Sequence, residues 1–221
     1  MVPARGRLQR QVLVLAALHV FIISASNYLV QLPVDLLGLH STWGAFSFPF
    51  IFLATDLTVR LLGKRAARRV VARSMLPALL VSYLVGVLFE HGQFAGWPAL
   101  GSFSSFVFRI ALASFAAYAL GQLLDIQVFD RIRQRSRRWW LAPAGSAVLG
   151  QALDSAVFFS VAFWHGSDPF MAAHWVEIGA LDYAIKLLAS LLFFVPAYGV
   201  FLKVLMRWLG HDPQPLAAAA R

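Results

Sequence analysis

Acidic and basic side chains interrupt the long apolar runs of this 221-residue sequence, and their spacing limits the chemistry available to them. Asp56 and Arg60 stand four residues apart, as do Asp182 and Lys186, so each pair lies on one face of a helix and can form an ion pair. An unpaired charge at the centre of a bilayer costs at least about 2.5–3.5 kcal/mol. We therefore expect these pairs to face protein, where they shape or gate a buried site.

Asp154 has no basic residue four positions away in either direction, so it needs another partner. Two interpretations stay open. The carboxylate accepts hydrogen bonds from a ligand, or it forms a salt bridge across helices with Arg109 or Lys186. Asp154 is the first candidate for a ligand-binding acceptor. The other candidates for substrate binding carry amide, guanidinium or aromatic groups, and they are Asn27, Gln31, Phe48, Arg109, Gln122 and Gln151.

These polar groups are more numerous than is needed to hold helices together, which favours a polar cavity. Carboxylates and amides can bind the edge of a flat heteroaromatic ligand, while phenylalanine rings stack on its face. The sequence has no Gly-x-Ser-x-Gly, His-Glu-x-x-His or phosphate-binding glycine motif. Its six histidines form no ligand-like cluster, and it has no cysteine. We expect no metal, no cofactor and no catalytic residue.

The elements that position these residues are apolar helices. Hydrophobic residues make up 60% of the chain, the mean hydropathy is +0.70, and only 13% of the residues are charged. One soluble core cannot bury so much apolar surface, so the expected solvent is lipid. Each apolar run is long enough to cross a hydrocarbon layer about 30 Å thick, which predicts an all-α, polytopic membrane protein with six transmembrane helices. The runs cover residues 11–34, 43–62, 74–91, 103–125, 141–163 and 176–207.

The basic residues fix the predicted orientation. Sixteen of the nineteen Lys and Arg residues lie on one predicted side of the membrane. They precede the first run, follow the second and fourth runs, or lie at the end of the sixth run and in the tail after it. Residues 35–42, 92–102 and 164–175 on the other side contain no Lys or Arg. This asymmetry follows the positive-inside rule, so both termini and the loops around residues 63–73 and 127–138 are expected in the cytoplasm. The net charge of +9 is thus explained by topology and anionic lipid, with no direct contact to nucleic acid.

A short internal similarity suggests two inverted three-helix halves. The second run reads "FLATDLTVRL" and the fifth reads "LGQALDSAVFF", each with an aspartate beside a small hydroxyl residue. Inverted repeats of this kind build transporters with a binding site near the membrane midplane. The expected organisation is a cytoplasmic tail at residues 1–10, a transmembrane domain at 11–207 and a second cytoplasmic tail at 208–221.

Six segments closely resemble the bacterial queuosine precursor transporter family, also called the vitamin uptake transporter-like family. The similarity runs from about residue 15 to residue 207, and its most specific part is the second-helix block. The segments are "SNYLVQLP", "TWGAFSFPFIFLATDLTVRLLG", "ASFAAYALGQLLD", "RRWWLAP", "LDSAVFFSVAFW" and "HWVEIGALDYAIKLL".

The resemblance implies an inner-membrane importer of 7-cyano-7-deazaguanine and 7-aminomethyl-7-deazaguanine, which are precursors of the modified tRNA nucleoside queuosine. Partners are then the deazapurine base and the lipid bilayer, and assembly into a homo-oligomer is left open. Two alternatives remain: an intramembrane hydrolase that uses aspartates, and a non-catalytic membrane subunit. A nearby cation favours the ionised carboxylate, so the expected ion pairs argue against the shared-proton chemistry of a hydrolase.

Overall fold

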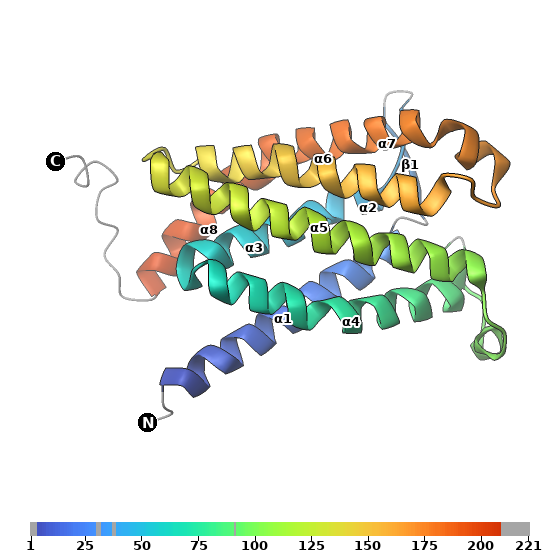
Figure 1. The fold of residues 1–221 in the computed structure, drawn as a ribbon, viewed down its shortest axis with the longest axis horizontal. Helices are drawn as coiled ribbons and strands as arrows, with labels where there is room; N and C mark the ends of the chain where they lie inside the picture. The colour runs from blue at the N-terminus through green and yellow to red at the C-terminus, as the bar shows by residue number, and fades with distance from the viewer. Residues whose placement is uncertain (1–3, 30–31, 37–38, 91, 209–221) are drawn as a thin grey trace.

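The computed structural model describes residues 4–29, 32–36, 39–90 and 92–208. It is an elongated bundle of helices that run roughly along one common axis (Figure 1). Both ends of the described chain lie at the same end of the bundle, as an even number of crossings requires. The helices are α1 (Ala4–Leu29), α2 (Trp43–Ser47), α3 (Pro49–Leu62), α4 (Lys64–Leu88), α5 (Ser105–Arg135), α6 (Leu141–Phe163), α7 (Pro169–Ala189) and α8 (Val195–Trp208).

Six segments are long and apolar enough to cross a membrane, which confirms the predicted all-α fold with six spans. Helices α2 and α3 together make the second span, and α7 continues into α8 to make the sixth. Large apolar side chains on these spans face outward, where lipid would cover them; examples are Leu13, Phe21, Leu80 and Phe193. The relation of the two halves by an inverted repeat stays a prediction.

Short structures close the end of the bundle opposite the termini. Strands β1 (Pro33–Leu36) and β2 (Leu39–Thr42) form one antiparallel hairpin, and β3 (Phe89–Glu90) and β4 (Gln93–Phe94) form another. The 3₁₀ turn η1 (Trp97–Gly101) follows the second hairpin. These are the only strands among the residues that the structure describes. The prediction of a first span to residue 34 was therefore too long, since α1 ends at Leu29 and Pro33 already begins a strand.

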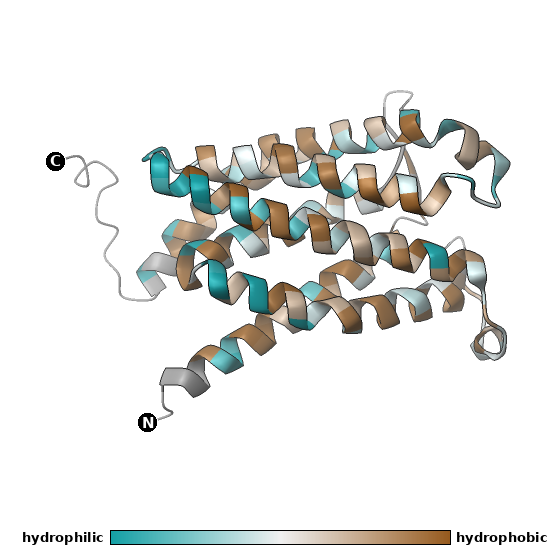
Figure 2. Ribbon diagram, in the orientation of Figure 1, coloured by the Kyte–Doolittle hydropathy of each residue, from teal (hydrophilic) through white to brown (hydrophobic). Residues whose placement is uncertain are grey.

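Two expected cytoplasmic loops are largely helical instead. Helix α4 begins at Lys64, directly after Gly63, whose φ of +84° allows the chain to reverse in a single residue. Helix α5 runs to Arg135, so the predicted span that ended at residue 125 was too short. Lysine and arginine are good helix formers, and here they extend the helices beyond their apolar segments. Figure 2 shows the resulting hydrophilic ends of these helices on the side of the termini.

The sixth span changes its helical pitch at η2 (Ser190–Phe194), which is a π-helical turn between α7 and α8. Pro196 follows this turn and has no N–H to donate, so an ordinary α-helical ladder cannot continue through it. The N–H of Val195 instead reaches the carbonyl of Ser190, five residues back. Such π-turns occur frequently at functional sites. This one carries Ser190 and Phe194 to the inside of the bundle.

Candidate functional site

Helices α5 and α6 approach closely at two glycines, and this contact brings the polar residues of several helices together. A Cβ atom placed on Gly121 would lie 3.1 Å from the Cβ of Asp154. One placed on Gly150 would lie 2.9 Å from the Phe52 ring and 3.0 Å from the Cβ of Asp125. Larger side chains at these glycines would force the helices apart. The close packing buries carboxylates from α3, α5 and α6 in one interior layer.

Lys186 of α7 links two of the predicted carboxylates. Its Nζ lies 2.6 Å from Asp182 Oδ2 and 3.6 Å from Asp154 Oδ2. The ammonium group also lies 4.9 Å from the centre of the Phe48 ring, in a cation–π contact. Ser155 donates a hydrogen bond of 2.9 Å to Asp182 Oδ2. The predicted Asp182–Lys186 pair is confirmed, and the cross-helix salt bridge considered for Asp154 is also present.

Besides the two carboxylate oxygens of Asp125, three buried polar atoms near this layer have no hydrogen-bond partner in the described chain. They are Asp154 Oδ1, Gln151 Oε1 and Gln122 Nε2. The other ends of the two amides are engaged: Gln151 Nε2 donates to Ser190 Oγ at 2.5 Å, and Gln122 Oε1 accepts from the Thr55 hydroxyl. A buried polar group without a partner costs about 1–3 kcal/mol. One donor and two acceptors are therefore left for a ligand.

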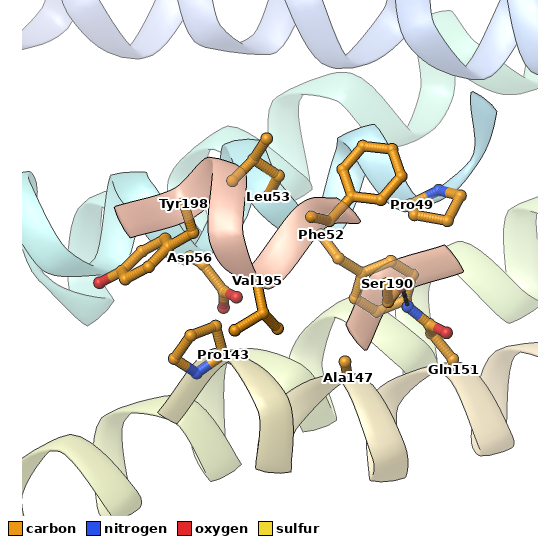
Figure 3. Close-up of a pocket in the computed structure, with 11 residues that line it drawn as sticks. Pro49, Phe52, Leu53, Asp56, Pro143, Ala147, Gln151, Ser190, Val195 and Tyr198 are labelled. Atoms are coloured by element: carbon orange, nitrogen blue, oxygen red, sulfur yellow. Dashed lines mark hydrogen bonds between the residues drawn. The ribbon is translucent and has the colours of Figure 1, made fainter. Parts of the chain in front are cut away.

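A narrow cleft opens between α3, α6, η2 and α8, and of these three residues only Gln151 lines it (Figure 3). Gln151 and Ser190 lie at one end of it, and Asp56 and Tyr198 lie at the other. Its free volume is only about 10 Å³, room for about one water molecule. The structure thus shows an occluded state, and a bicyclic ligand requires the helices around the cleft to separate. Its apolar lining consists of Pro49, Phe52, Leu53, Pro143, Ala147, Phe194 and Val195.

Asp56 does not pair with Arg60, so that prediction was wrong for this state. Asp56 is 3% exposed and interacts with Asp125 of α5, and the Ser146 hydroxyl of α6 donates to its Oδ1 at 3.4 Å. The side chain of Arg60 makes no ion pair or hydrogen bond within the described chain, although its carbonyl accepts from Arg133. Four-residue spacing allowed the pair, but the carboxylate turns to the interior between α5 and α6.

Three further candidates lie apart from this site or outside the described residues. Asn27 donates to Ser82 Oγ at 2.5 Å, where α1 contacts α4. Arg109 donates to the carbonyls of Val161, Trp164 and His165 at the C-terminal end of α6, so it caps that helix. Gln31 is not among the described residues.

Within the described residues, no group of three or more His, Cys, Asp or Glu side chains is placed to hold a metal. His19 is fully buried, and its Nδ1 lies 2.9 Å from the Tyr118 hydroxyl, which in turn lies 2.7 Å from Ser74 Oγ. This histidine links α1 to α4 and α5.

Several residues of the site were missed in the sequence. Asp125 was placed at the inner end of the fourth span, because that span was predicted to stop there. The apolar residues Ile126 and Phe129, which follow Asp125 in the sequence, were the signal that the buried face continues past it. In the structure both are fully buried. Tyr198 and Ser190 became part of the cleft through the π-turn. Only the position of Pro196 in the sequence hinted at that irregularity.

A six-helix bundle that encloses partnerless polar groups and a narrow cleft has the architecture of a small-molecule transporter. Comparison with known proteins identifies its family. Residues 42–201 match the family model described as "Putative vitamin uptake transporter". The chain is 57% identical to the queuosine precursor transporter of Escherichia coli K12 over 200 residues, which cover 90% of each chain.

Two more relatives carry the name probable queuosine precursor transporter. The one from Haemophilus influenzae is 50% identical over 213 residues, covering 91% of this chain and 90% of the relative. The one from Bacillus subtilis is 33% identical over 184 residues, covering 80% and 79%. No solved structure matches the chain. The chain therefore belongs to the queuosine precursor transporter family, a family of multi-pass membrane transporters.

Proposed function

We propose that this protein imports 7-cyano-7-deazaguanine and 7-aminomethyl-7-deazaguanine across the bacterial inner membrane for queuosine synthesis. The names of the relatives support the substrate class. The observation that carries the proposal is a set of three partnerless atoms on α5 and α6, those of Gln122, Gln151 and Asp154. They offer one donor and two acceptors inside the bundle.

The guanine-like edge of both precursors has the complementary pattern. It presents a carbonyl acceptor, then the ring N1–H donor, then the 2-amino donor. Gln122 Nε2 can donate to the carbonyl, while Asp154 Oδ1 and Gln151 Oε1 can accept from the two donors. Gln122 follows Gly121, against which Asp154 packs, so these groups come from adjoining turns. Phe48 and Phe52 provide aromatic faces on the neighbouring segment of the chain.

Binding at this site requires the cleft to open. Separation of α8 from α3 and α6 would break the contacts of Val195 and Tyr198 and admit the base. The π-turn η2 is the natural hinge for such a movement, since its hydrogen-bond ladder is already irregular. Alternation between opening toward one side and the other then moves the base across the membrane.

The hydrolase alternative has one structural feature in its favour, namely the contact of Asp56 with Asp125. The relatives, however, are named as queuosine precursor transporters. If the protein binds a deazaguanine and releases it chemically unchanged, the result supports transport. A hydrolase would release an altered product.

The test uses purified protein in liposomes with labelled 7-cyano-7-deazaguanine outside and unlabelled base inside. We expect the label to exchange into the lumen and to be recovered chemically unchanged. Guanosine should compete poorly, because its ribose adds bulk that neither precursor carries. The base should also raise the free energy of unfolding by about 2.7 kcal/mol at one hundred times Kd. A raised Tm reports this binding independently of transport. Liposomes that neither bind nor exchange the base would contradict the proposal.

We also propose that both termini face the cytoplasm. Basic residues gather at the ends of α4 and α5 on the side of the termini, in agreement with the positive-inside rule. Since the chain has no cysteine, single cysteines are unambiguous reporters. In intact spheroplasts, Ser102→Cys beyond η1 should react with an impermeant thiol reagent, while Ser136→Cys after α5 should react only after lysis. The reverse pattern would invert the orientation.

A further inference from the structure

Asp56 and Asp125 face each other inside the membrane-spanning bundle. Asp56 is 3% exposed and Asp125 is fully buried, and the two carboxyl groups lie within interacting distance. Neither oxygen of Asp125 receives a hydrogen bond from a donor group of the described chain. The Ser146 hydroxyl lies beside them and donates to Asp56 Oδ1 at 3.4 Å. The pair is thus close, buried and almost without donors.

No cation in the described chain neutralises this pair. Lys186 of α7 is already engaged by Asp182 and Asp154, and Arg109 is bound to carbonyls at the other end of α6. On the remaining side, the Tyr198 hydroxyl of α8 lies within electrostatic range of Asp56, Arg60 and Arg133. Arg133 donates to the carbonyl of Val59 at 2.9 Å, and Arg60 forms no ion pair with a described residue.

Two carboxylates in contact in a site of low dielectric constant cannot both remain ionised. They are stable together when one proton lies between them, so that one carboxyl group donates to the other. The occluded arrangement therefore requires a proton as its ligand. Asp56 and Gln151 also line the same cleft. The proton site and the proposed substrate site thus share one access route.

From this geometry we infer that Asp56 and Asp125 form a proton-binding site that couples movement of the base to movement of one proton. The inference rests on the proposed function and adds its source of energy. When the cleft is open to the outside, one proton enters the pair from external water. After the cleft reopens inward, the same proton leaves to cytoplasmic water as the base is released.

Arg60 can stabilise the pair after the proton has left. It lies one helical turn from Asp56 on the same helix, so a rotated Asp56 carboxylate can pair with it once Asp125 has moved away. The unloaded carrier can then return without a proton. Without such an alternative partner, every passage through the occluded state would carry a proton and no net coupling would result.

The inference is tested first on the unmodified protein in liposomes, with the membrane potential clamped at zero and the outside one pH unit more acidic. One proton per neutral 7-cyano-7-deazaguanine predicts accumulation of about tenfold, because one pH unit corresponds to about 1.36 kcal/mol. An entrapped pH dye should report acidification of the lumen when the base is added. Exchange of the base without accumulation or acidification would overturn the coupling alone. Absence of any exchange would overturn the proposed function as well.

Asp125→Asn identifies the site. The amide donates to Asp56 permanently, so no proton is needed for occlusion. We expect base-for-base exchange to continue while accumulation falls from about tenfold to none. The matched control is Asp130→Asn on the same helix, where the carboxylate contacts Lys64 at 3.8 Å near the inner end; its accumulation should remain. If Asp125→Asn still accumulates the base tenfold, the pair is not the coupling site. If that variant fails to fold, the dye measurement on the unmodified protein still decides whether coupling exists, and Asp56→Asn locates it.

Discussion

Replacement of Lys186 by methionine should destabilise the protein by about 3–5 kcal/mol and abolish uptake of the base. The side chain is 7% exposed and lies between Asp182 and Asp154, so its removal leaves the buried Asp154 and the partly buried Asp182 without their counter-ion. Methionine keeps most of the apolar stem of the side chain, so the substitution mainly removes the charge and with it the cation–π contact with the Phe48 ring. Thermal unfolding of the protein in detergent measures the loss as a fall in Tm.

The control is the combined variant Lys186→Met/Asp182→Asn/Asp154→Asn, in which no charge of the cluster remains. It should recover most of the lost stability but none of the uptake, because breaking a buried ion pair costs more than removing it altogether. Equal losses in the single and the combined variant would show that Lys186 stabilises the bundle through packing rather than charge.

The fold was predictable because the bilayer imposes a simple rule on the sequence. A span needs about 20 apolar residues, and six runs of the chain satisfy that length. The boundaries were less predictable, since basic residues that mark the membrane surface also form helices well. Lys64 therefore begins α4, and Arg135 ends α5, where loops were expected. The two hairpins also escaped prediction, because segments of two to four residues carry too little periodicity.

The site was predictable only where neighbours on one helix decide the contact. Asp182 and Lys186 pair as their spacing indicates. Asp56 does not pair with Arg60, since its partner Asp125 comes from a helix 69 positions further along the chain and meets it only through tertiary packing. Such contacts leave no local pattern. Arg109 likewise donates hydrogen bonds to carbonyls at the end of α6, and no spacing within its own helix could indicate this contact.

Asp154→Asn should weaken binding of the cyano and the aminomethyl precursor together, by about 1–3 kcal/mol. The substitution keeps the shape of the side chain but replaces one acceptor oxygen by an NH₂ donor, which opposes a donor of the substrate. Both precursors share this edge, so Kd should rise by the same factor, roughly 5- to 150-fold, for each. Calorimetric titration of the detergent-solubilised protein with both compounds measures the two factors.

The contact with Lys186 offers a purely structural explanation for Asp154, and Asp182→Asn separates the two. Asp182 binds the same ammonium group at 2.6 Å, more closely than Asp154 does at 3.6 Å, but no oxygen of Asp182 is buried without a partner. If Asp154 acts only as a counter-ion, Asp182→Asn should lower the Tm of the empty protein at least as much, and neither variant should alter Kd. If Asp154 binds the base, Kd should rise far more in Asp154→Asn than in Asp182→Asn. That difference follows from Oδ1, the one oxygen of the cluster that is buried and still free to accept a hydrogen bond in the described chain.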